Sequence, residues 1–215
     1  MLHPVQDGEV TLSYPFMGFF GDWQALPVFD SDIYDDETAS ICETQIGQFR
    51  NSDGGGYILG HNYYVDGAEA YNAEKIAIKG NESGKNVTAA VSLLRNAEKL
   101  TFSVDDSEGN TVYSESLSKV SKTYHSSEGF YTPMAAKGWE PFDSWNAPLD
   151  DGNYVYKITA SVGGREETKA FPIVIDSVAP EVISSKIEGA TWIVTVHDNH
   201  YIQGVCATAN GNAPL

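Results

Sequence analysis

The fold of this chain is decided by two neighbouring stretches, Tyr154-Val155-Tyr156-Lys157-Ile158-Thr159-Ala160 and Lys169-Ala170-Phe171-Pro172-Ile173-Val174-Ile175. β-branched, aromatic and polar side chains alternate in both, as they do in strands with one buried face. Val162-Gly163-Gly164-Arg165 lies between them and predicts a tight hairpin, because glycine readily takes the positive φ that hairpin turns need. Pro172 lacks a backbone N–H, so we expect its strand at a sheet edge or a bulge.

A period of two recurs along the rest of the chain. It is found in residues 10–14, 75–79, 100–104 and 191–196, and residues 57–59 form a further candidate strand. Only residues 68–73 and 89–99 suggest helices, and their neighbours favour a strand for the second segment. Many short strands with regular turns predict an all-β, immunoglobulin- or fibronectin-like antiparallel β-sandwich.

Two breaks in the pattern predict the domain limits. The first is a joint around Gly54-Gly55-Gly56, and the second is the run Asp176-Ser177-Val178-Ala179-Pro180. We therefore expect residues 1–65 to hold the C-terminal part of one sandwich and the joint, and residues 66–178 to form a complete sandwich. Residues 179–215 would then begin a further sandwich, so that the partial domains flank the complete one.

The net charge of the chain limits the classes of molecule that it can bind. It carries 13 basic and 30 acidic residues, a net charge of −17. Such a field repels a phosphate backbone, which excludes nucleic acid as a partner, and it weakens binding to anionic lipid. No apolar run is long enough to cross a membrane, and residues 1–4 do not resemble a signal peptide. We expect an excised piece of a longer extracellular chain.

The two cysteines follow no metal or redox spacing. Cys42 and Cys206 are far apart in the sequence, so a disulfide between them stays open.

An acidic run offers a candidate calcium site. Its members are Asp30, Asp32, Asp35, Asp36 and Glu37. Calcium takes six to eight oxygen ligands, which clustered carboxylates can supply, but the spacing does not match an EF-hand loop. We expect a solvated acidic loop, with calcium binding as the alternative. The pair Asp150-Asp151 indicates turn chemistry, with the same alternative.

Two histidine-containing segments are weaker candidates. His197-Asp198-Asn199-His200 could supply two imidazoles and a carboxylate to zinc, but a zinc site needs further ligands, so we expect a polar turn. His125-Ser126-Ser127-Glu128 places a histidine near hydroxyls and a carboxylate. Residues adjacent in sequence rarely form a catalytic triad, so we expect a loop there.

Two tryptophans form a candidate surface for ligands. Trp139 and Trp145 flank the residues Glu140-Pro141-Phe142-Asp143-Ser144. Exposed aromatic rings can stack on sugars or grip a peptide, whereas buried ones pack beneath loops. We take both residues as candidates for surface binding of sugar or peptide, with packing as the alternative.

Several blocks of this sequence resemble a known family. They are Tyr14-Pro15-Phe16-Met17-Gly18-Phe19-Phe20-Gly21-Asp22-Trp23, Leu26-Pro27-Val28-Phe29-Asp30, Gly56-Tyr57-Ile58-Leu59-Gly60, Leu93-Leu94-Arg95-Asn96-Ala97 and Leu149-Asp150-Asp151-Gly152-Asn153-Tyr154-Val155-Tyr156. In this order they resemble the fibronectin type III-like domains behind the catalytic domain of lactocepin-type cell-envelope subtilisin-like proteases, a group that includes streptococcal complement-inactivating peptidases. Asp176-Ser177-Val178-Ala179-Pro180-Glu181 is similar to the start of the next such domain. Lys79-Gly80-Asn81-Glu82-Ser83-Gly84 departs from the family's Ser-Pro-Asn-Gly-Asp turn.

The resemblance implies a secreted, wall-associated serine protease of a Gram-positive bacterium as the parent chain. It places the catalytic Asp, His and Ser upstream of Met1, and this chain has no Gly-Thr-Ser-Met-type nucleophile turn. We therefore expect no catalytic residue, no cofactor and no metal ligand here. The expected partners are the upstream protease domain and a protein substrate or cell-wall component. A carbohydrate- or protein-binding adhesin module is the alternative, and an independent hydrolase is the third hypothesis.

Overall fold

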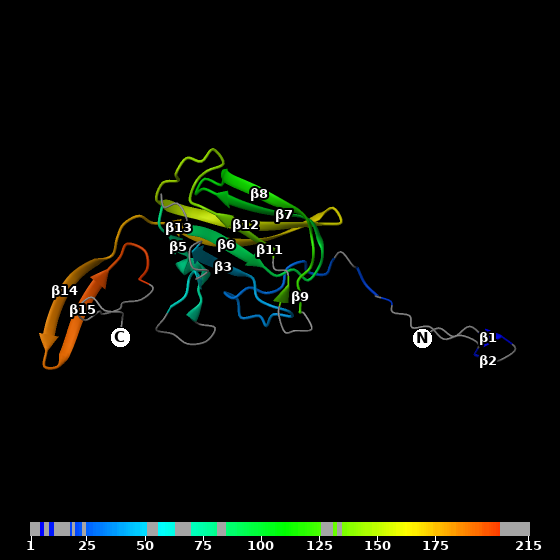
Figure 1. Ribbon diagram of the computed structural model, residues 1–215, viewed down its shortest axis with the longest axis horizontal. Coiled ribbons are helices and arrows are strands. Elements are labelled where there is room, and N and C mark those ends of the chain that lie inside the picture. Colours follow the sequence, from blue (N-terminus) through cyan, green and yellow to red (C-terminus); the bar gives the residue numbers. More distant parts are fainter. Residues whose placement is uncertain are drawn as a thin grey trace.

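A computed structural model describes residues 5–6, 9–10, 18, 20–22, 25–50, 56–62, 70–80, 85–125, 131–132 and 135–202. In these ranges the chain forms strands and no α-helix, as Figure 1 shows. The strands are β1 (Val5–Gln6), β2 (Glu9–Val10), β3 (Gln45–Arg50), β4 (Gly56–Ile58), β5 (Ala77–Ile78), β6 (Lys85–Val91), β7 (Ala97–Asp105), β8 (Thr111–Val120), β9 (Tyr124–His125), β10 (Tyr131–Thr132), β11 (Ala135–Trp139), β12 (Gly152–Val162), β13 (Arg165–Ile175), β14 (Glu181–Glu188) and β15 (Thr191–His197). A 3-10 turn, η3, spans Ala73–Lys75.

Two sheets make up the body of the molecule. One has the strand order β11-β6-β3-β4, and the other has the order β5-β13-β12-β7-β8. All neighbouring strands in them are antiparallel except β13 and β5, which are parallel. One hydrophobic core lies between the sheets and draws on both. The all-β sandwich predicted from the sequence is confirmed.

The core follows the period of two. On β6 of the first sheet, Val87, Ala89 and Val91 are fully buried, whereas Thr88 and Ala90 between them are half-buried. The second sheet contributes Leu100, Phe102 and Val104 from β7, Tyr156, Ile158 and Ala160 from β12, and Phe171, Ile173 and Ile175 from β13. Alternation along each strand therefore gives each sheet one inner face, and burial of these faces stabilises the sandwich.

The long hairpin forms as predicted. Strands β12 and β13 pair from Gly152↔Ile175 to Val162↔Arg165, and Gly163 and Gly164 take φ values of 60° and 77° in the turn. Positive φ at both central positions belongs to the hairpin turn whose twist matches that of the strands.

The prediction for Pro172 is also confirmed. On the side away from β12, β13 pairs with β5 only at Val174 and Ile175. The N–H groups of Val174 and Asp176 donate to β5 or its neighbour Ile76. Backbone groups alternate along a strand, so the missing N–H of Pro172 falls on this same side, before the pairing begins.

The shorter predictions hold with changed limits. Residues 89–99 are strand at both ends, but the chain turns between Val91, the end of β6, and Ala97, the start of β7. Residues 57–59 correspond to β4, and the segment 75–79 is reduced to β5 and buries Ile76 and Ile78. The helix candidate at 68–73 lies mostly outside the described residues.

The first predicted domain limit needs correction. Strands β3 and β4 precede residue 65, but they share a sheet with β6 and β11, which follow it. Phe29 also forms a bridge with Leu93. Residues from Val28 onward therefore belong to this sandwich, because β3 and β4 form part of its first sheet and cover the core. The second limit stays a prediction: β14 and β15 pair only with each other among the described strands.

Close packing fixes one turn of this first sheet. Gly60 follows β4 and has a φ of +74°, and a Cβ atom added there would lie 2.4 Å from the carbonyl oxygen of Asn72. Glycine is required for both reasons.

Within the described ranges, no helix is long and apolar enough to cross a membrane.

Candidate functional site

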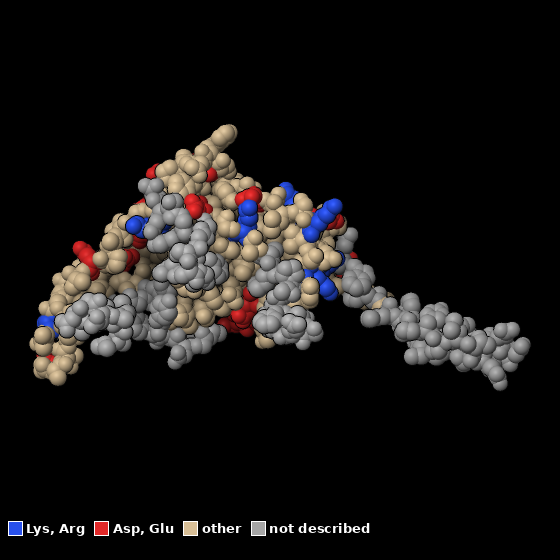
Figure 2. All heavy atoms as spheres, in the orientation of Figure 1, with Lys and Arg blue, Asp and Glu red and all other residues tan. Residues whose placement is uncertain are grey.

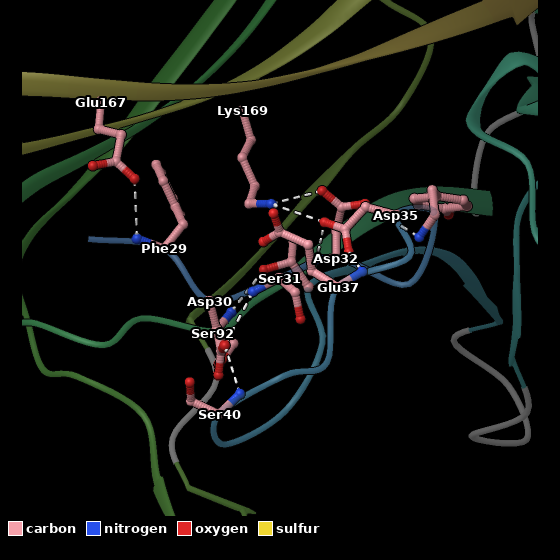
Figure 3. Close-up of polar contacts among 12 residues, drawn as sticks. Phe29, Asp30, Ser31, Asp32, Asp35, Glu37, Ser40, Ser92, Glu167 and Lys169 are labelled. Carbon is pink, nitrogen blue, oxygen red and sulfur yellow. Dashed lines mark hydrogen bonds and ion pairs between the residues drawn. The ribbon is translucent and has the colours of Figure 1, made fainter. Parts of the chain in front are cut away.

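The acidic run predicted as a calcium candidate folds inward at its first residue. Asp30 is 5% exposed, and its carboxylate accepts backbone N–H groups from Ser31 at 3.0 Å, Ser40 at 2.8 Å, Ile41 at 2.7 Å and Cys42 at 3.3 Å. Figure 3 shows Asp30 facing the returning chain at Ser40. The carboxylate therefore closes a loop of residues 30–42 by satisfying amides that no strand pairs.

Asp32 and Asp35 are joined to the second sheet by a lysine. The Nζ atom of Lys169, on β13, lies 2.6 Å from Asp32 Oδ2 and 3.9 Å from Asp35 Oδ2. Both carboxylates also accept backbone N–H groups inside the loop, Asp32 from Tyr34 at 3.2 Å and Asp35 from Asp32 at 3.0 Å and Glu37 at 2.9 Å. Figure 3 shows this cluster.

A second charged residue of β13 holds the start of the same segment, and sequence reasoning missed it. The Glu167 carboxylate accepts the N–H groups of Val28, at 3.1 Å from Oε2, and Phe29, at 3.3 Å. A signal was present: Glu167 and Lys169 continue the inward phase of Phe171, Ile173 and Ile175. A charge in an inward phase must find a partner, because burying it unpaired is costly.

These contacts describe a clamp, which we call the acidic clamp: Asp30, Asp32, Asp35, Glu167 and Lys169. It holds the loop after Val28 against β13 of the five-stranded sheet. The carboxylates of its loop residues are occupied by amides and by one ammonium group. Among the described residues, no group of three or more His, Cys, Asp or Glu side chains is arranged to hold a metal ion.

The rest of the acidic run faces solvent, as predicted for a solvated loop. Asp36 and Glu37 are exposed and, with Glu43, line an open hollow of about 570 Å³. In Figure 2 a group of carboxylates lies low on the sandwich, in the region of this loop. The run thus divides into inward residues that organise the fold and outward residues that carry charge.

Cys42 lines the same hollow. It is half-buried, and its Sγ atom lies 3.4 Å from Ser92 Oγ. Cys206 lies outside the described residues, so the pairing of the two cysteines stays open.

The structure describes all of one histidine candidate, residues 197–200, and of the other only His125, the last residue of β9. After β15, the Asp198 carboxylate accepts the N–H groups of His200 at 2.9 Å and Tyr201 at 3.2 Å, which makes the expected polar turn. The Nε2 atom of His200 is buried with no partner among the described residues. Of the segment His125-Ser126-Ser127-Glu128, the residues after His125 lie outside the described ranges.

Asp150 and Asp151 take part in turn contacts. The Asp150 carbonyl accepts the Tyr154 hydroxyl at 2.9 Å, and the Asp151 carboxylate accepts the Ser177 N–H at 3.0 Å.

Trp139 is a core residue and not a surface binding residue, which corrects that prediction. It is 2% exposed, and its indole N–H donates to the carbonyl of Phe142 at 3.1 Å. Its ring centroid lies 6.2 Å from those of both Tyr113 and Tyr156. The reason is pairing: β11 places Trp139 opposite Val87, on the inner face of the first sheet.

Trp145 is presented to solvent as predicted for a surface residue. It is 91% exposed and sits in a turn organised by Asp143, whose carboxylate accepts the N–H groups of Trp145 and Ala147, each at 2.8 Å. Asn146 has a φ of +63°, in the left-handed region that non-glycine residues seldom take. The turn is therefore held in a defined shape with its largest apolar side chain outside.

A second clamp joins the two sheets along one side. Lys137 on β11 forms an ion pair with Glu115 on β8, and Glu115 accepts the Tyr113 hydroxyl at 2.7 Å. These hydrogen bonds from Lys137 and Tyr113 hold the pKa of Glu115 below its ordinary value. Burial raises the pKa of Tyr113, and the hydrogen bond to Glu115 raises it further. Charge again serves to fix one sheet against the other.

This chain is similar in sequence to several known proteases. No protein-family model matches the chain. A PI-type proteinase of Lactococcus lactis subsp. cremoris is 28% identical over 217 residues, which cover 92% of this chain and 11% of that protein. A PII-type proteinase of Lacticaseibacillus paracasei is 28% identical over 223 residues, which cover 92% of this chain and 11% of that protein. A C5a peptidase of Streptococcus pyogenes is 30% identical over 162 residues, 72% of this chain and 14% of that protein.

The chain is a homologue of one region of these proteases. The resemblance to accessory domains of cell-envelope subtilisin-like proteases is thereby confirmed. The chain spans only 11 to 14% of the length of these curated relatives. Among solved structures, dimeric latent PorU of Porphyromonas gingivalis aligns with 64% of this chain and 10% of its own at a TM-score of 0.36 and 14% identity. CopC of Methylosinus trichosporium OB3b aligns with 47% of this chain and 82% of the CopC chain, with a TM-score of 0.28 and 14% identity.

The polar contacts described above hold the loop and the two sheets of this segment against each other. Its best-defined polar groups, in the acidic clamp and in the Lys137–Glu115 pair, are directed at backbone amides and at each other. Trp145 is the predicted candidate that remains on the surface with a defined setting.

Proposed function

We propose that this chain is a non-catalytic accessory region of a secreted, cell-wall-associated subtilisin-like serine protease. It spaces the catalytic domain from the wall and contributes to the choice of large protein substrates. The observation that carries the proposal is the alignment: 92% of this chain matches 11% of a cell-envelope proteinase. A match of this shape is expected for one region of a much longer chain.

The architecture supports a spacer. A spacer must transmit position, so its two layers should not slide. Glu167 and Lys169 bind the loop that follows Val28, and Lys137 binds Glu115 along one side of the sandwich. The first contacts hold the loop against β13, the Lys137–Glu115 pair joins the two sheets, and one core lies between the sheets. The fibronectin-like character and the extracellular, wall-associated location form part of the same proposal.

Two experiments test it. The reading frame that encodes Met1 should continue upstream into a subtilisin-like domain, and a frame without such a domain would refute the proposal. In the parent protease, replacing residues 28–176 with a flexible linker should leave kcat/KM for a short peptide within about twofold. The same replacement should lower kcat/KM at least tenfold for a folded protein substrate. Equal effects on both substrates would contradict a role in substrate choice.

One observation favours a second candidate, a carbohydrate- or protein-binding adhesin module. The 91% exposure of Trp145 leaves a large aromatic face free for stacking. Binding of this chain to a glycan array that is lost in Trp145→Ala would support this candidate. The third hypothesis, an independent hydrolase, requires peptidase turnover by the purified chain that a serine-directed inhibitor abolishes.

A further inference from the structure

One long strand edge of the sandwich is open. Strand β8 ends the five-stranded sheet and pairs only with β7 among the described residues. In Figure 1 it is the outermost strand at the top of the sandwich. It spans ten residues, so it offers a long row of backbone donors and acceptors. Such a row is a template for another extended chain.

The outward groups of β8 belong to three serines. Backbone groups of successive residues in an antiparallel strand point to opposite edges. Counting across the sheet from Val174, whose N–H donates toward β5, the registers of β13, β12 and β7 direct Tyr113, Glu115 and Leu117 of β8 toward β7. The N–H and C=O groups of Ser114, Ser116 and Ser118 therefore point outward, and all three residues are exposed.

Both ends of this open edge are marked. At one end the pairing of β7 and β8 shifts by one residue, and the Val112 carbonyl accepts the backbone N–H of Ser144 at 2.9 Å. Ser144 thus occupies the place that a residue of a neighbouring strand would occupy. At the other end Lys119 has a φ of +56°, which departs from strand geometry one residue before β8 ends at Val120. The open stretch between them is six residues long.

Trp145 stands at the first end. It follows Ser144 directly, so its side chain leaves the chain beside the place where an added strand would begin. Val112 and Ser114 are two residues apart, which is about 7 Å along a strand. An aromatic side chain reaches a neighbour at that separation. The left-handed Asn146 and the Asp143 hydrogen bonds hold the turn in this position.

We propose that the outer edge of β8, with Trp145 at its end, binds an extended polypeptide segment by adding it as a sixth strand. The backbone of the segment pairs with Ser114, Ser116 and Ser118, and an apolar or aromatic side chain packs on the Trp145 ring. This deepens the proposed function, since it rests on a protein substrate as the partner and names where an unfolded stretch of it is held.

Charge complements this assignment. The chain carries a net charge of −17, so a basic or neutral polypeptide is favoured over an acidic one. The edge itself is nearly neutral, because Glu115 is paired with Lys137. Affinity should therefore come from backbone pairing and from Trp145, and salt should change it only moderately.

The probe for the test is hen lysozyme in two forms. Reduced and carboxamidomethylated lysozyme is an unfolded, basic polypeptide, and native lysozyme has the same sequence and stays folded. Binding to the immobilised 215-residue chain is measured by biolayer interferometry in 0.15 M salt. The unfolded form is expected to bind with at least tenfold higher affinity than the native form, because only an extended chain can pair with β8.

Two pairs of variants identify the surface. Ser116→Pro removes an outward N–H and places a ring on the edge, whereas Ser116→Ala keeps the N–H. Trp145→Ala removes the ring, and Trp192→Ala removes another exposed tryptophan, 58% exposed, on the separate β14–β15 sheet. We expect at least a tenfold loss of affinity in Ser116→Pro and Trp145→Ala. Ser116→Ala and Trp192→Ala should stay within twofold of the parent chain.

The opposite results overturn the inference. These are absence of binding to unfolded lysozyme at 1 mM, equal binding of both forms, or full affinity in Ser116→Pro with an unchanged circular dichroism spectrum. Self-association of the chain that Ser116→Pro abolishes, without binding to unfolded lysozyme, would assign the edge to a second copy and also overturn it. None of these results affects the upstream reading frame, so failure here is distinguishable from failure of the spacer role.

Discussion

Replacing Asp30 with alanine tests the idea that the acidic run is first a structural device. The Asp30 carboxylate accepts four backbone N–H groups at 2.7 to 3.3 Å. A hydrogen bond to a charged group contributes about 1.5–3 kcal/mol, and a buried N–H left unpaired costs about 1–3 kcal/mol. Ser31 is buried, but Ser40 is exposed, so water replaces part of what Asp30→Ala removes.

The expected loss of unfolding free energy is therefore about 3 kcal/mol, well below the sum of four separate bonds. For a chain of this size this corresponds to a fall in Tm of about 6–12 °C. Urea unfolding followed by circular dichroism measures the free energy. Hydrogen exchange of the amides of Ser40, Ile41 and Cys42 reports the loop itself, and their protection should fall in Asp30→Ala.

Two variants serve as controls for this prediction. Asp30→Asn keeps one acceptor oxygen and should cost about half as much as alanine. Asp36→Ala removes an exposed acid of the same run and should cost less than about 0.5 kcal/mol. If Asp30→Ala were as mild as Asp36→Ala, or if calcium raised Tm in the parent chain and not in Asp30→Ala, the run would be a metal site and the reasoning would be wrong.

Three further predictions follow from single contacts. Burial alone would raise the pKa of Asp105, but hydrogen bonds, first from Lys157, hold it below the ordinary value of 3.8. This carboxylate therefore stabilises the fold above pH 3.8 and ceases to do so as pH falls through its lowered pKa, so Asp105→Asn should flatten the acid limb of a stability–pH curve. Gly60→Ala should destabilise the chain by more than about 2 kcal/mol in urea unfolding, because its Cβ would meet Asn72 and its φ disfavours a side chain. Trp139→Phe should lower stability by about 1–3 kcal/mol in the same assay and leave any ligand binding unchanged, because the residue is a core residue.

Local pattern was sufficient for the strands and insufficient for their partners. The alternation around Tyr156 and Phe171, the Gly163–Gly164 turn and the place of Pro172 are properties of short stretches, and all were predictable. The bridge between Phe29 and Leu93 joins residues far apart in the chain. Nothing in either stretch encodes that choice, because register is set when two apolar faces meet.

The candidate site shows the same division. Trp139 and Trp145 lie in one short segment of similar composition, yet one is 2% and the other 91% exposed. Pairing of β11 with β6 turns Trp139 inward, whereas the Asp143 turn after the strand carries Trp145 outward. The inward charge of Glu167 was detectable from the phase of β13, but its partner, the backbone at Val28, was not.

The open edge of β8 becomes informative when it is set beside the closed parts of the same molecule. Natural sheets protect long edges with proline, bulges or inward charges, since an unprotected edge invites aggregation. Here the start of β8 is covered by Ser144, and the exposed Glu115 forms an ion pair with Lys137. The stretch between Val112 and Lys119 contains no proline, and its outward backbone groups belong to small serines that leave room for a neighbour. A protein that ties Asp30, Asp32 and Glu167 into a clamp and leaves this stretch of β8 accessible has the shape expected of a strand acceptor.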